Sequence, residues 1–276
     1  MQTERPLGEH ARRAARTYGA AADHYDLAAL SFWDRFGAAT VAGLPLAAGH
    51  TVLDLCCGAG ASAIPAARLV GPEGRVLGID VAESLLEMAR ARAAREDLAN
   101  IGFRAGDATR TALPDGSFDA VICVFGVFFV PDMAEFVAEM WRLVRPGGVL
   151  AGTTWGAGLF EPANTAFWES VREVEPSLFK VFNPWDEITT QAARADLLAR
   201  GGVEHPAVRA AQGRHHLDDP DRFWDIVLGT GYRATIDALS QEQGDIVRTR
   251  LLSRLQSEGI TSVRTDVIFS TAQRLH

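Results

Sequence analysis

The sequence has few of the residues that several classes of protein need. Lys180 is the only lysine, and the 276 residues include 27 basic and 35 acidic side chains, for a formal charge of -8. No basic stripe is longer than Arg12–Arg13, whereas a nucleic-acid-binding protein needs a basic face to displace phosphate counterions. We therefore expect no nucleic-acid partner.

Cysteine and long apolar runs are also scarce. The cysteines are three, Cys56, Cys57 and Cys123, and the first two are adjacent. An odd number in this arrangement indicates no disulfide framework. Residues 1–20 contain no apolar signal segment, and the longest apolar run, 120–130, is too short to cross a bilayer. We expect a cytoplasmic protein without a membrane span.

The remaining composition is that of a packed enzyme-sized protein. Hydrophobic residues make up 47% of the chain and charged residues 22%, values typical of soluble globular proteins rather than fibrous or disordered ones. The length suits one large domain, or a core domain with insertions. Residues 1–48 are expected to form an N-terminal helical cap or lid, and 49–276 the core.

Short apolar runs alternate with helical patterns along the first half of the core. Strands are expected at 51–55, 75–79, 101–105, 118–124 and 149–155, with helices at 61–70, 84–97 and 132–143. Such alternation predicts an α/β fold with a parallel sheet. Beyond it, we expect helical insertions at about 156–202 and 218–258, and strands at 207–217 and 263–271.

The most informative segment is VLDLCCGAG, residues 52–60. It predicts a strand that runs into a glycine-bearing turn and then a helix, where free N–H groups and a close backbone approach favour a bound ligand. Asp80 follows at the end of the second strand, where a carboxylate can accept both hydroxyls of a ribose. The same segment also fits the dinucleotide pattern G-x-G-x-x-A, so a nicotinamide cofactor is the competing interpretation.

Two further acidic residues favour a ligand without phosphate. Asp54 would repel a pyrophosphate at the end of the first strand, but it suits a ligand that carries ammonium and sulfonium charges. Asp107 is placed to accept a hydrogen bond from an adenine amino group, and Ala108 has a free backbone N–H for a ring nitrogen. A ligand with adenine, ribose and an amino-acid tail is S-adenosylmethionine.

The chain resembles the class I S-adenosylmethionine-dependent methyltransferases, in particular the small-molecule branch similar to the ubiquinone- and menaquinone-biosynthesis methyltransferases. The resemblance covers about residues 18–156 through the ordered motifs VLDLCCGAG, VLGID, AGDAT, LPDGSFDAVICVFGV and LVRPGGVLAGTTW. It implies a Rossmann-like, seven-stranded, mostly parallel sheet with helices on both faces, insertions after strands five and six, and an antiparallel last strand at 263–271.

The resemblance also implies S-adenosylmethionine as cofactor, S-adenosylhomocysteine as product, and a set of binding residues. Cys56 departs from the family, which usually has glycine there. Tyr18 lies, like Tyr25, where the N-terminal lid of the family often touches the cofactor. The implied cofactor-binding residues are Tyr25, Asp54, Cys56, Cys57, Gly58, Gly60, Asp80, Val81, Asp107, Ala108, Val124 and Phe125.

The segment after the fourth strand, residues 124–129, is apolar and lacks the polar clamp of enzymes that methylate nucleic-acid bases. It predicts a small, largely apolar or aromatic methyl acceptor. We expect its pocket to include Phe128, Trp155, Trp185 and Trp224. His24, His215 and His216 are candidate bases, and no metal site is expected, since the His215–His216 pair lacks a recognised ligand spacing.

The sequence therefore predicts an enzyme that transfers a methyl group from S-adenosylmethionine to oxygen, nitrogen or carbon of such a metabolite. An NAD(P)-dependent oxidoreductase that uses the same glycine turn and a non-methylating S-adenosylmethionine-binding protein are the alternatives. A monomer and a homodimer are both compatible with the sequence.

Overall fold

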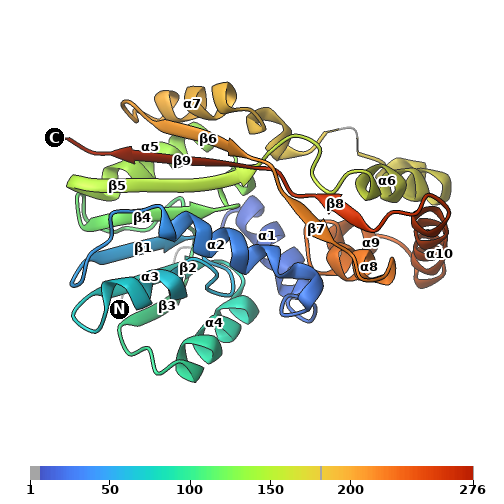
Figure 1. Cartoon of the computed structure of the whole chain (residues 1–276), viewed down its shortest axis with the longest axis horizontal. Helices are drawn as coiled ribbons and strands as arrows, with labels where there is room; N and C mark the ends of the chain where they lie inside the picture. Colours follow the sequence, from blue (N-terminus) through green and yellow to red (C-terminus); the bar gives the residue numbers. More distant parts are fainter. Residues whose placement is uncertain (1–6, 181, 276) are drawn as a thin grey trace.

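A seven-stranded sheet forms the centre of the molecule, a computed structural model that describes residues 7–180 and 182–275 (Figure 1). The strands are β1 (Thr51–Leu55), β2 (Arg75–Asp80), β3 (Ile101–Ala105), β4 (Phe118–Val124), β5 (Val144–Trp155), β6 (Ala207–Ala211) and β9 (Val267–Gln273). Their order is β3-β2-β1-β4-β5-β9-β6, and β9 runs antiparallel to both of its neighbours. The mostly parallel sheet with an antiparallel last strand is therefore confirmed.

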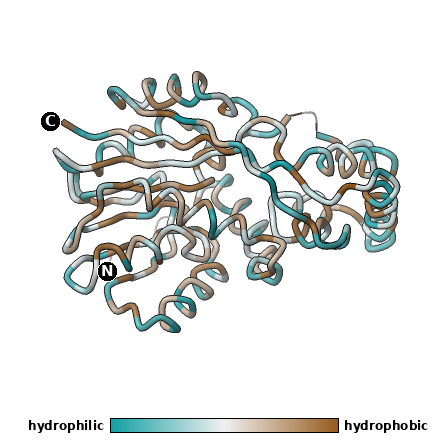
Figure 2. The backbone as a smooth tube through the Cα atoms, viewed as in Figure 1, coloured by the Kyte–Doolittle hydropathy of each residue, from teal (hydrophilic) through white to brown (hydrophobic). Residues whose placement is uncertain are grey.

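Helices cover both faces of this sheet. They include α3 (Ala63–Val70), α4 (Glu83–Arg95), α5 (Met133–Leu143) and α7 (Gln191–Arg200). Successive strand residues point to opposite faces, so Val52 joins the apolar cluster of α3 while Leu53 joins that of α5 and α7. Figure 2 shows the hydrophobic residues that line the central strands as a result. α7 lies within the range expected as an insertion, but it packs against α5, β6 and β9.

The N-terminal segment lies against the ends of the strands. It contains α1 (Glu9–Ala21), the 3-10 helix η1 (Ala28–Leu30) and α2 (Phe32–Ala42), whereas residues 1–6 of the expected cap lie outside the described part. Gly37 of α2 packs so closely on the β1–α3 turn that an added Cβ would lie 2.3 Å from the carbonyl oxygen of Ala61. Arg92 of α4 donates to Ala59 of that turn and to Asp34 of α2.

A smaller helical lobe extends from one end of the sheet (Figure 1). It contains α6 (Ala163–Val174), α8 (Asp221–Leu228), α9 (Arg233–Ile236), α10 (Gln241–Ser257) and the two-stranded sheet of β7 (Arg214–His216) and β8 (Ser262–Arg264). Three further 3-10 helices are η2 (Val127–Phe129), η3 (Pro176–Leu178) and η4 (Pro184–Ile188). α10 packs along α6, so the lobe has its own helical contacts.

The expected strand at 207–217 is wrong as one continuous element. It divides into β6 and β7 around Gly213, whose N–H donates to the Asp266 carboxylate at 2.9 Å. An added Cβ on Gly213 would lie 2.4 Å from the Thr265 carbonyl oxygen. This close approach interrupts both segments of the sheet. It separates β6 from β7 and, on the other segment, β8 from β9.

Candidate functional site

A cavity of about 210 Å3 opens where β1, β2 and β4 end, and we call it the glycine-turn cavity. The carboxyl ends of parallel strands are the usual place for a ligand in this type of fold. Most of the residues expected to bind a cofactor line it, although they come from separate elements. These residues are Tyr25, Cys56, Cys57, Gly58, Asp80, Val81, Asp107, Ala108, Val124 and Phe125.

The turn after β1 is held by the carboxylate at the end of β2. Gly58 N–H donates to Asp80 Oδ2 at 2.9 Å, and Ala82 N–H donates to Asp80 Oδ1 at 2.9 Å. Burial raises the pKa of Asp80, while these backbone donors oppose that shift. Gly58 has a φ of 51°, a conformation that glycine adopts without strain. Asp80 is thus held in place by the turn, and it also lines the cavity.

Asp107 is oriented by the residue that follows it. Its Oδ1 accepts from the Thr109 backbone N–H at 2.9 Å and from the Thr109 hydroxyl at 2.7 Å. Ala108 is buried against the core beside it. A carboxylate in a fixed direction on the cavity wall can select a ligand with an amino group, as the adenine ring has.

Two of the expected binding residues do not line the cavity. Gly60 faces the opposite side, where an added Cβ would lie 3.0 Å from Ile64 Cδ1. Asp54 is fully buried, and its Oδ2 accepts from the Ser62 hydroxyl at 2.7 Å. Ser62 does line the cavity, so Asp54 is connected to the cavity wall through the Ser62 hydroxyl.

The buried Asp54 predicts a pH dependence of stability. Burial raises the pKa of Asp54 to about 7, well above the usual range of an aspartate. A carboxyl group whose pKa is higher in the folded than in the unfolded state stabilises the fold at pH values below its unfolded-state pKa. This contribution is lost as the pH rises through about 7. We therefore expect Asp54→Asn to raise the free energy of unfolding of the ligand-free protein at pH 8, by up to about 4 kcal/mol.

Urea unfolding at pH 6 and pH 8 checks this expectation. The stability of the wild type should fall between the two pH values, and that of Asp54→Asn should fall less. Asp196→Asn is a matched control because Asp196 is an exposed carboxylate on α7, and its pH dependence should follow the wild type. Equal slopes for wild type and Asp54→Asn would contradict the assignment.

Helix α1 contributes residues that the sequence did not single out. Glu9 and His10 line the glycine-turn cavity, as do Leu85 and Arg110 from the β2–α4 and β3–β4 regions. Their position depends on how α1 crosses the strand ends, which helical periodicity alone does not specify. Only Tyr18 of α1 had been noted, and it also lines this cavity.

A second, smaller cavity of about 30 Å3 adjoins the first, and we call it the aromatic cavity. Tyr18, Trp33 and Phe129 line both cavities, so the two cavities meet at these side chains. Phe128, Trp155 and Trp185, three of the expected acceptor residues, line the aromatic cavity as well. Trp224 lines neither cavity.

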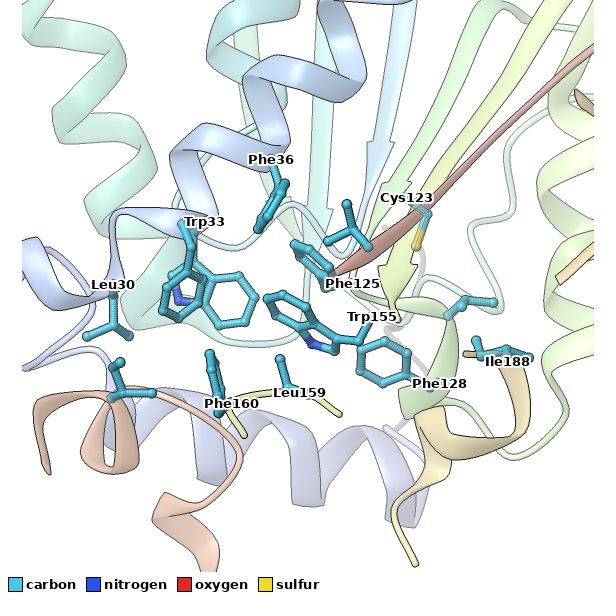
Figure 3. Packing of buried hydrophobic residues seen from close by; sticks show 14 of the residues in the cluster. Leu30, Trp33, Phe36, Cys123, Phe125, Phe128, Trp155, Leu159, Phe160 and Ile188 are labelled. Carbon is cyan, nitrogen blue, oxygen red and sulfur yellow. The ribbon is translucent and has the colours of Figure 1, made fainter. Parts of the chain in front are cut away.

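Trp33 belongs to a group of packed aromatic rings where the two cavities meet (Figure 3). Phe125 stacks on Trp155 with ring centroids 3.9 Å apart, and Trp33 packs edge-on against Phe125 at 5.4 Å. Figure 3 shows Phe125 and Trp155 between Phe36 and Phe128. The place where the cavities meet is therefore lined mainly by aromatic side chains.

The three candidate bases lie away from both cavities. His24 is paired with Asp23 at 2.7 Å, and His216 is exposed. His215 is buried edge-on against Phe32, and burial together with Arg35 lowers its pKa. Adjacent residues of β7 thus face opposite ways, and none of the three reaches the aromatic cavity.

Within residues 7–180 and 182–275, no group of His, Cys, Asp and Glu side chains is arranged to hold a metal ion. In the same part of the chain, no helix is both long and apolar enough to traverse a bilayer.

Comparison with known proteins places this site in a family. Residues 52–148 match the family described as "Methyltransferase domain". Demethylmenaquinone methyltransferase of Listeria monocytogenes serotype 4a is 42% identical over 103 residues, which are 37% of this chain and 44% of that protein. Nocamycin O-methyltransferase of Saccharothrix syringae is 33% identical over 184 residues, 67% of this chain and 59% of that protein.

A solved structure extends the similarity to the fold of nearly the whole chain. Phosphoethanolamine N-methyltransferase 2 of Haemonchus contortus, in complex with S-adenosyl-L-methionine, superposes with a TM-score of 0.59 at 18% identity, covering 96% of this chain and 60% of that one. The chain spans about half the length of the curated relatives it matches. It belongs to the class I S-adenosylmethionine-dependent methyltransferases, and residues 52–148 form its methyltransferase domain.

Proposed function

We propose that the chain transfers the methyl group of S-adenosylmethionine to oxygen, nitrogen or carbon of a small, largely apolar or aromatic metabolite. The observation that carries this proposal is that Tyr18, Trp33 and Phe129 line both cavities, so that the two cavities meet at these side chains. A cofactor in the glycine-turn cavity would lie beside an acceptor in the aromatic cavity, whose volume of about 30 Å3 must widen to admit it. Two curated relatives are named demethylmenaquinone methyltransferase and nocamycin O-methyltransferase, and these names are in keeping with such an acceptor.

Under this proposal, the residues of the glycine turn and the strand ends hold the cofactor. Asp80 would accept the ribose hydroxyls and Asp107 the adenine amino group, while the negative charge of Asp54 would favour the cationic end. The cofactor supplies an electrophilic methyl group on a sulfonium. Among the described residues, Glu9, Asp80 and Asp107 line the cavity against a single arginine, Arg110. This acidic lining supports an adenosyl sulfonium over a nicotinamide dinucleotide, which carries a pyrophosphate.

The protein's part in the reaction is to position the acceptor and exclude water. An in-line displacement gains most of its rate from these effects when no proton has to be removed. Burial, with Asp80 and Cys56 nearby, raises the pKa of Tyr18, so its hydroxyl stays protonated and can donate to an acceptor oxygen. We therefore propose an acceptor that is nucleophilic without a histidine base, such as an ionised phenol or enol.

The remaining parts of the proposal follow from charge and composition. The net charge of -8 and the apolar segment after β4 support a small-molecule partner and no nucleic acid. We place the protein in the cytoplasm, and both monomer and homodimer remain open.

The test is an acceptor screen with radiolabelled S-adenosylmethionine, followed by Trp185→Ala. Trp185 lies edge-on to Phe128 at 5.6 Å in the aromatic cavity. Its truncation should raise the KM of a phenolic or quinol acceptor by about tenfold and leave the Kd of S-adenosylhomocysteine unchanged. Trp224→Ala is the control, since Trp224 lines neither cavity, and it should not change the acceptor KM. Equal effects of the two variants would contradict the assignment of the acceptor pocket.

A further inference from the structure

A buried arginine without a carboxylate lies beneath the glycine-turn cavity. Arg194 of α7 is 1% exposed, and its Nε donates to the Ser270 hydroxyl at 3.2 Å. Its Nη1 has no hydrogen-bond partner, and no carboxylate within the described ranges forms a salt bridge with it. A buried guanidinium is costly unless a negative charge lies nearby. The surroundings of Arg194 should therefore contain a group that can become an anion.

Cys123 is that group. In the sheet register Cys123 of β4 is paired with Gly152 of β5, and a Cβ added to Gly152 would lie 2.6 Å from Arg194 Nη2. The missing side chain of Gly152 thus leaves the space in which the guanidinium lies beside Cys123. Burial lowers the pKa of Arg194 to about 10, and the charge of Cys123 opposes that shift. The buried cation would compensate a negative charge that develops on the Cys123 sulfur during a reaction.

A second thiol connects this pair to the cavity. Cys56 Sγ and Cys123 Sγ each lie 2.8 Å from the position that a Cβ on Gly126 would occupy. A hydrogen bond with Cys123, together with burial, raises the pKa of Cys56. Cys56 therefore keeps its proton and donates to Cys123. Cys56 also lines the glycine-turn cavity, whereas Cys123 is buried and lines neither cavity, so small molecules reach the pair past Cys56.

We propose that Cys56 and Cys123, together with Arg194, form an oxidation site that hydrogen peroxide converts to a disulfide, and that this disulfide prevents cofactor binding. The second part rests on the proposed function, whereas the disulfide itself does not. Cys57 takes no part, because its thiol lies against Gly78, on the side of Asp54 and Asp80.

The chemistry balances with hydrogen peroxide as the only oxidant. The Cys123 thiolate attacks one peroxide oxygen, the O–O bond breaks, and the leaving hydroxide takes the proton of Cys56 to form water. The Cys56 thiolate then attacks the sulfenic sulfur of Cys123, and the second hydroxide takes a proton from solvent. Two thiols are oxidised to one disulfide, and one peroxide is reduced to two waters.

The disulfide would change the turn that holds the cofactor. Cys56 is the first residue of that turn and has a φ of 59°, so its backbone has little freedom to adjust. Disulfide geometry fixes the separation of the two sulfurs and the torsion between them, and Cys56 must move toward β4 to reach it. Conversely, a bound cofactor would cover Cys56 and protect the pair.

Peptide mapping of the peroxide-treated full chain tests the disulfide without any activity assay. Cys56 and Cys123 fall in different tryptic peptides, which end at Arg68 and Arg142. We expect these peptides to be cross-linked, with the loss of two hydrogen masses, in wild type and in Cys57→Ala. Reduction with dithiothreitol should release them. A Cys56–Cys57 bond, or no cross-link, would overturn the proposal.

The role of Arg194 is tested by the pH dependence of cross-linking. Arg194→Gln should slow the reaction by about tenfold at pH 7 and by less at pH 10, where thiols ionise without help. Arg194→Lys keeps the charge and should stay closer to wild type. A variant that only loosens the packing would change the rate equally at both pH values, and that result would overturn the role of Arg194.

Cofactor binding is measured separately on the oxidised protein. Its affinity for S-adenosylhomocysteine should fall by about tenfold or more, because a binding turn must be held to within a fraction of an ångström, and reduction should restore it. Prior addition of S-adenosylhomocysteine should slow the cross-link. If the cross-link forms and the affinity is unchanged, the second part of the proposal is wrong. If the reduced protein binds no S-adenosylhomocysteine, the proposed function fails and the oxidation site stands.

Discussion

Asp80→Ala is expected to weaken S-adenosylhomocysteine binding by about two orders of magnitude, the largest effect of any single change at the cofactor site. The substitution removes a carboxylate that accepts from Gly58 and Ala82 and, in the proposed complex, from the ribose. A hydrogen bond to a charged group contributes about 1.5–3 kcal/mol. The loss of two hydrogen bonds from the ribose therefore weakens binding by at least about two orders of magnitude. Isothermal titration calorimetry measures it directly.

The control for this prediction is Glu83→Ala. Glu83 is an exposed carboxylate in the first turn of α4, three residues along the chain, and it pairs with Arg90. Its removal changes the net charge by the same amount but should leave the affinity within about twofold, since exposed ion pairs contribute little. A similar loss in both variants would indicate a general charge effect and contradict the specific role of Asp80.

Gly37→Ala should cause the largest loss of stability. The new Cβ would lie 2.3 Å from the Ala61 carbonyl oxygen and 2.9 Å from the Ser62 backbone nitrogen, so α2 and the glycine turn must separate. Overpacking of this kind costs about 1–3 kcal/mol, and more where backbone has to move. We expect a decrease of about 3 kcal/mol in the free energy of unfolding, measured by urea denaturation, and weaker S-adenosylhomocysteine binding.

Gly43→Ala is the matched control at the end of the same helix. The nearest atom to its added Cβ is the Thr40 carbonyl oxygen at 3.6 Å, an ordinary contact, and its φ is -84°. The same chemical change should therefore alter stability by less than about 1 kcal/mol. If Gly37→Ala were equally mild, α2 would not be held against the glycine turn as the structure indicates.

The sequence predicted the strands that carry the site because their patterns are local. β1, β3 and β4 begin and end where their apolar runs do, and Gly58 and Asp80 mark the strand ends that meet at the glycine-turn cavity. Parallel strands bring their carboxyl ends together regardless of the loops between them. The cofactor side of the site therefore follows from a few motifs and the topology.

The features that the sequence did not predict depend on contacts between distant segments. Gly213 divides the expected strand because it packs on Thr265, fifty-two residues away along the chain. Nothing in the local pattern around His215 shows that β7 turns it against Phe32. The position of the Arg194 guanidinium likewise depends on the absence of a side chain at Gly152, a feature of tertiary structure that no local motif records.

The central claim is that the glycine-turn cavity binds an adenosyl ligand without phosphate. Parallel calorimetric titrations of the reduced full chain with S-adenosylhomocysteine and with NADH test it most directly. The account predicts binding of S-adenosylhomocysteine in the micromolar range and no measurable heat with NADH. Binding of NADH, with none of S-adenosylhomocysteine, would contradict it and would assign the same turn to a nicotinamide cofactor.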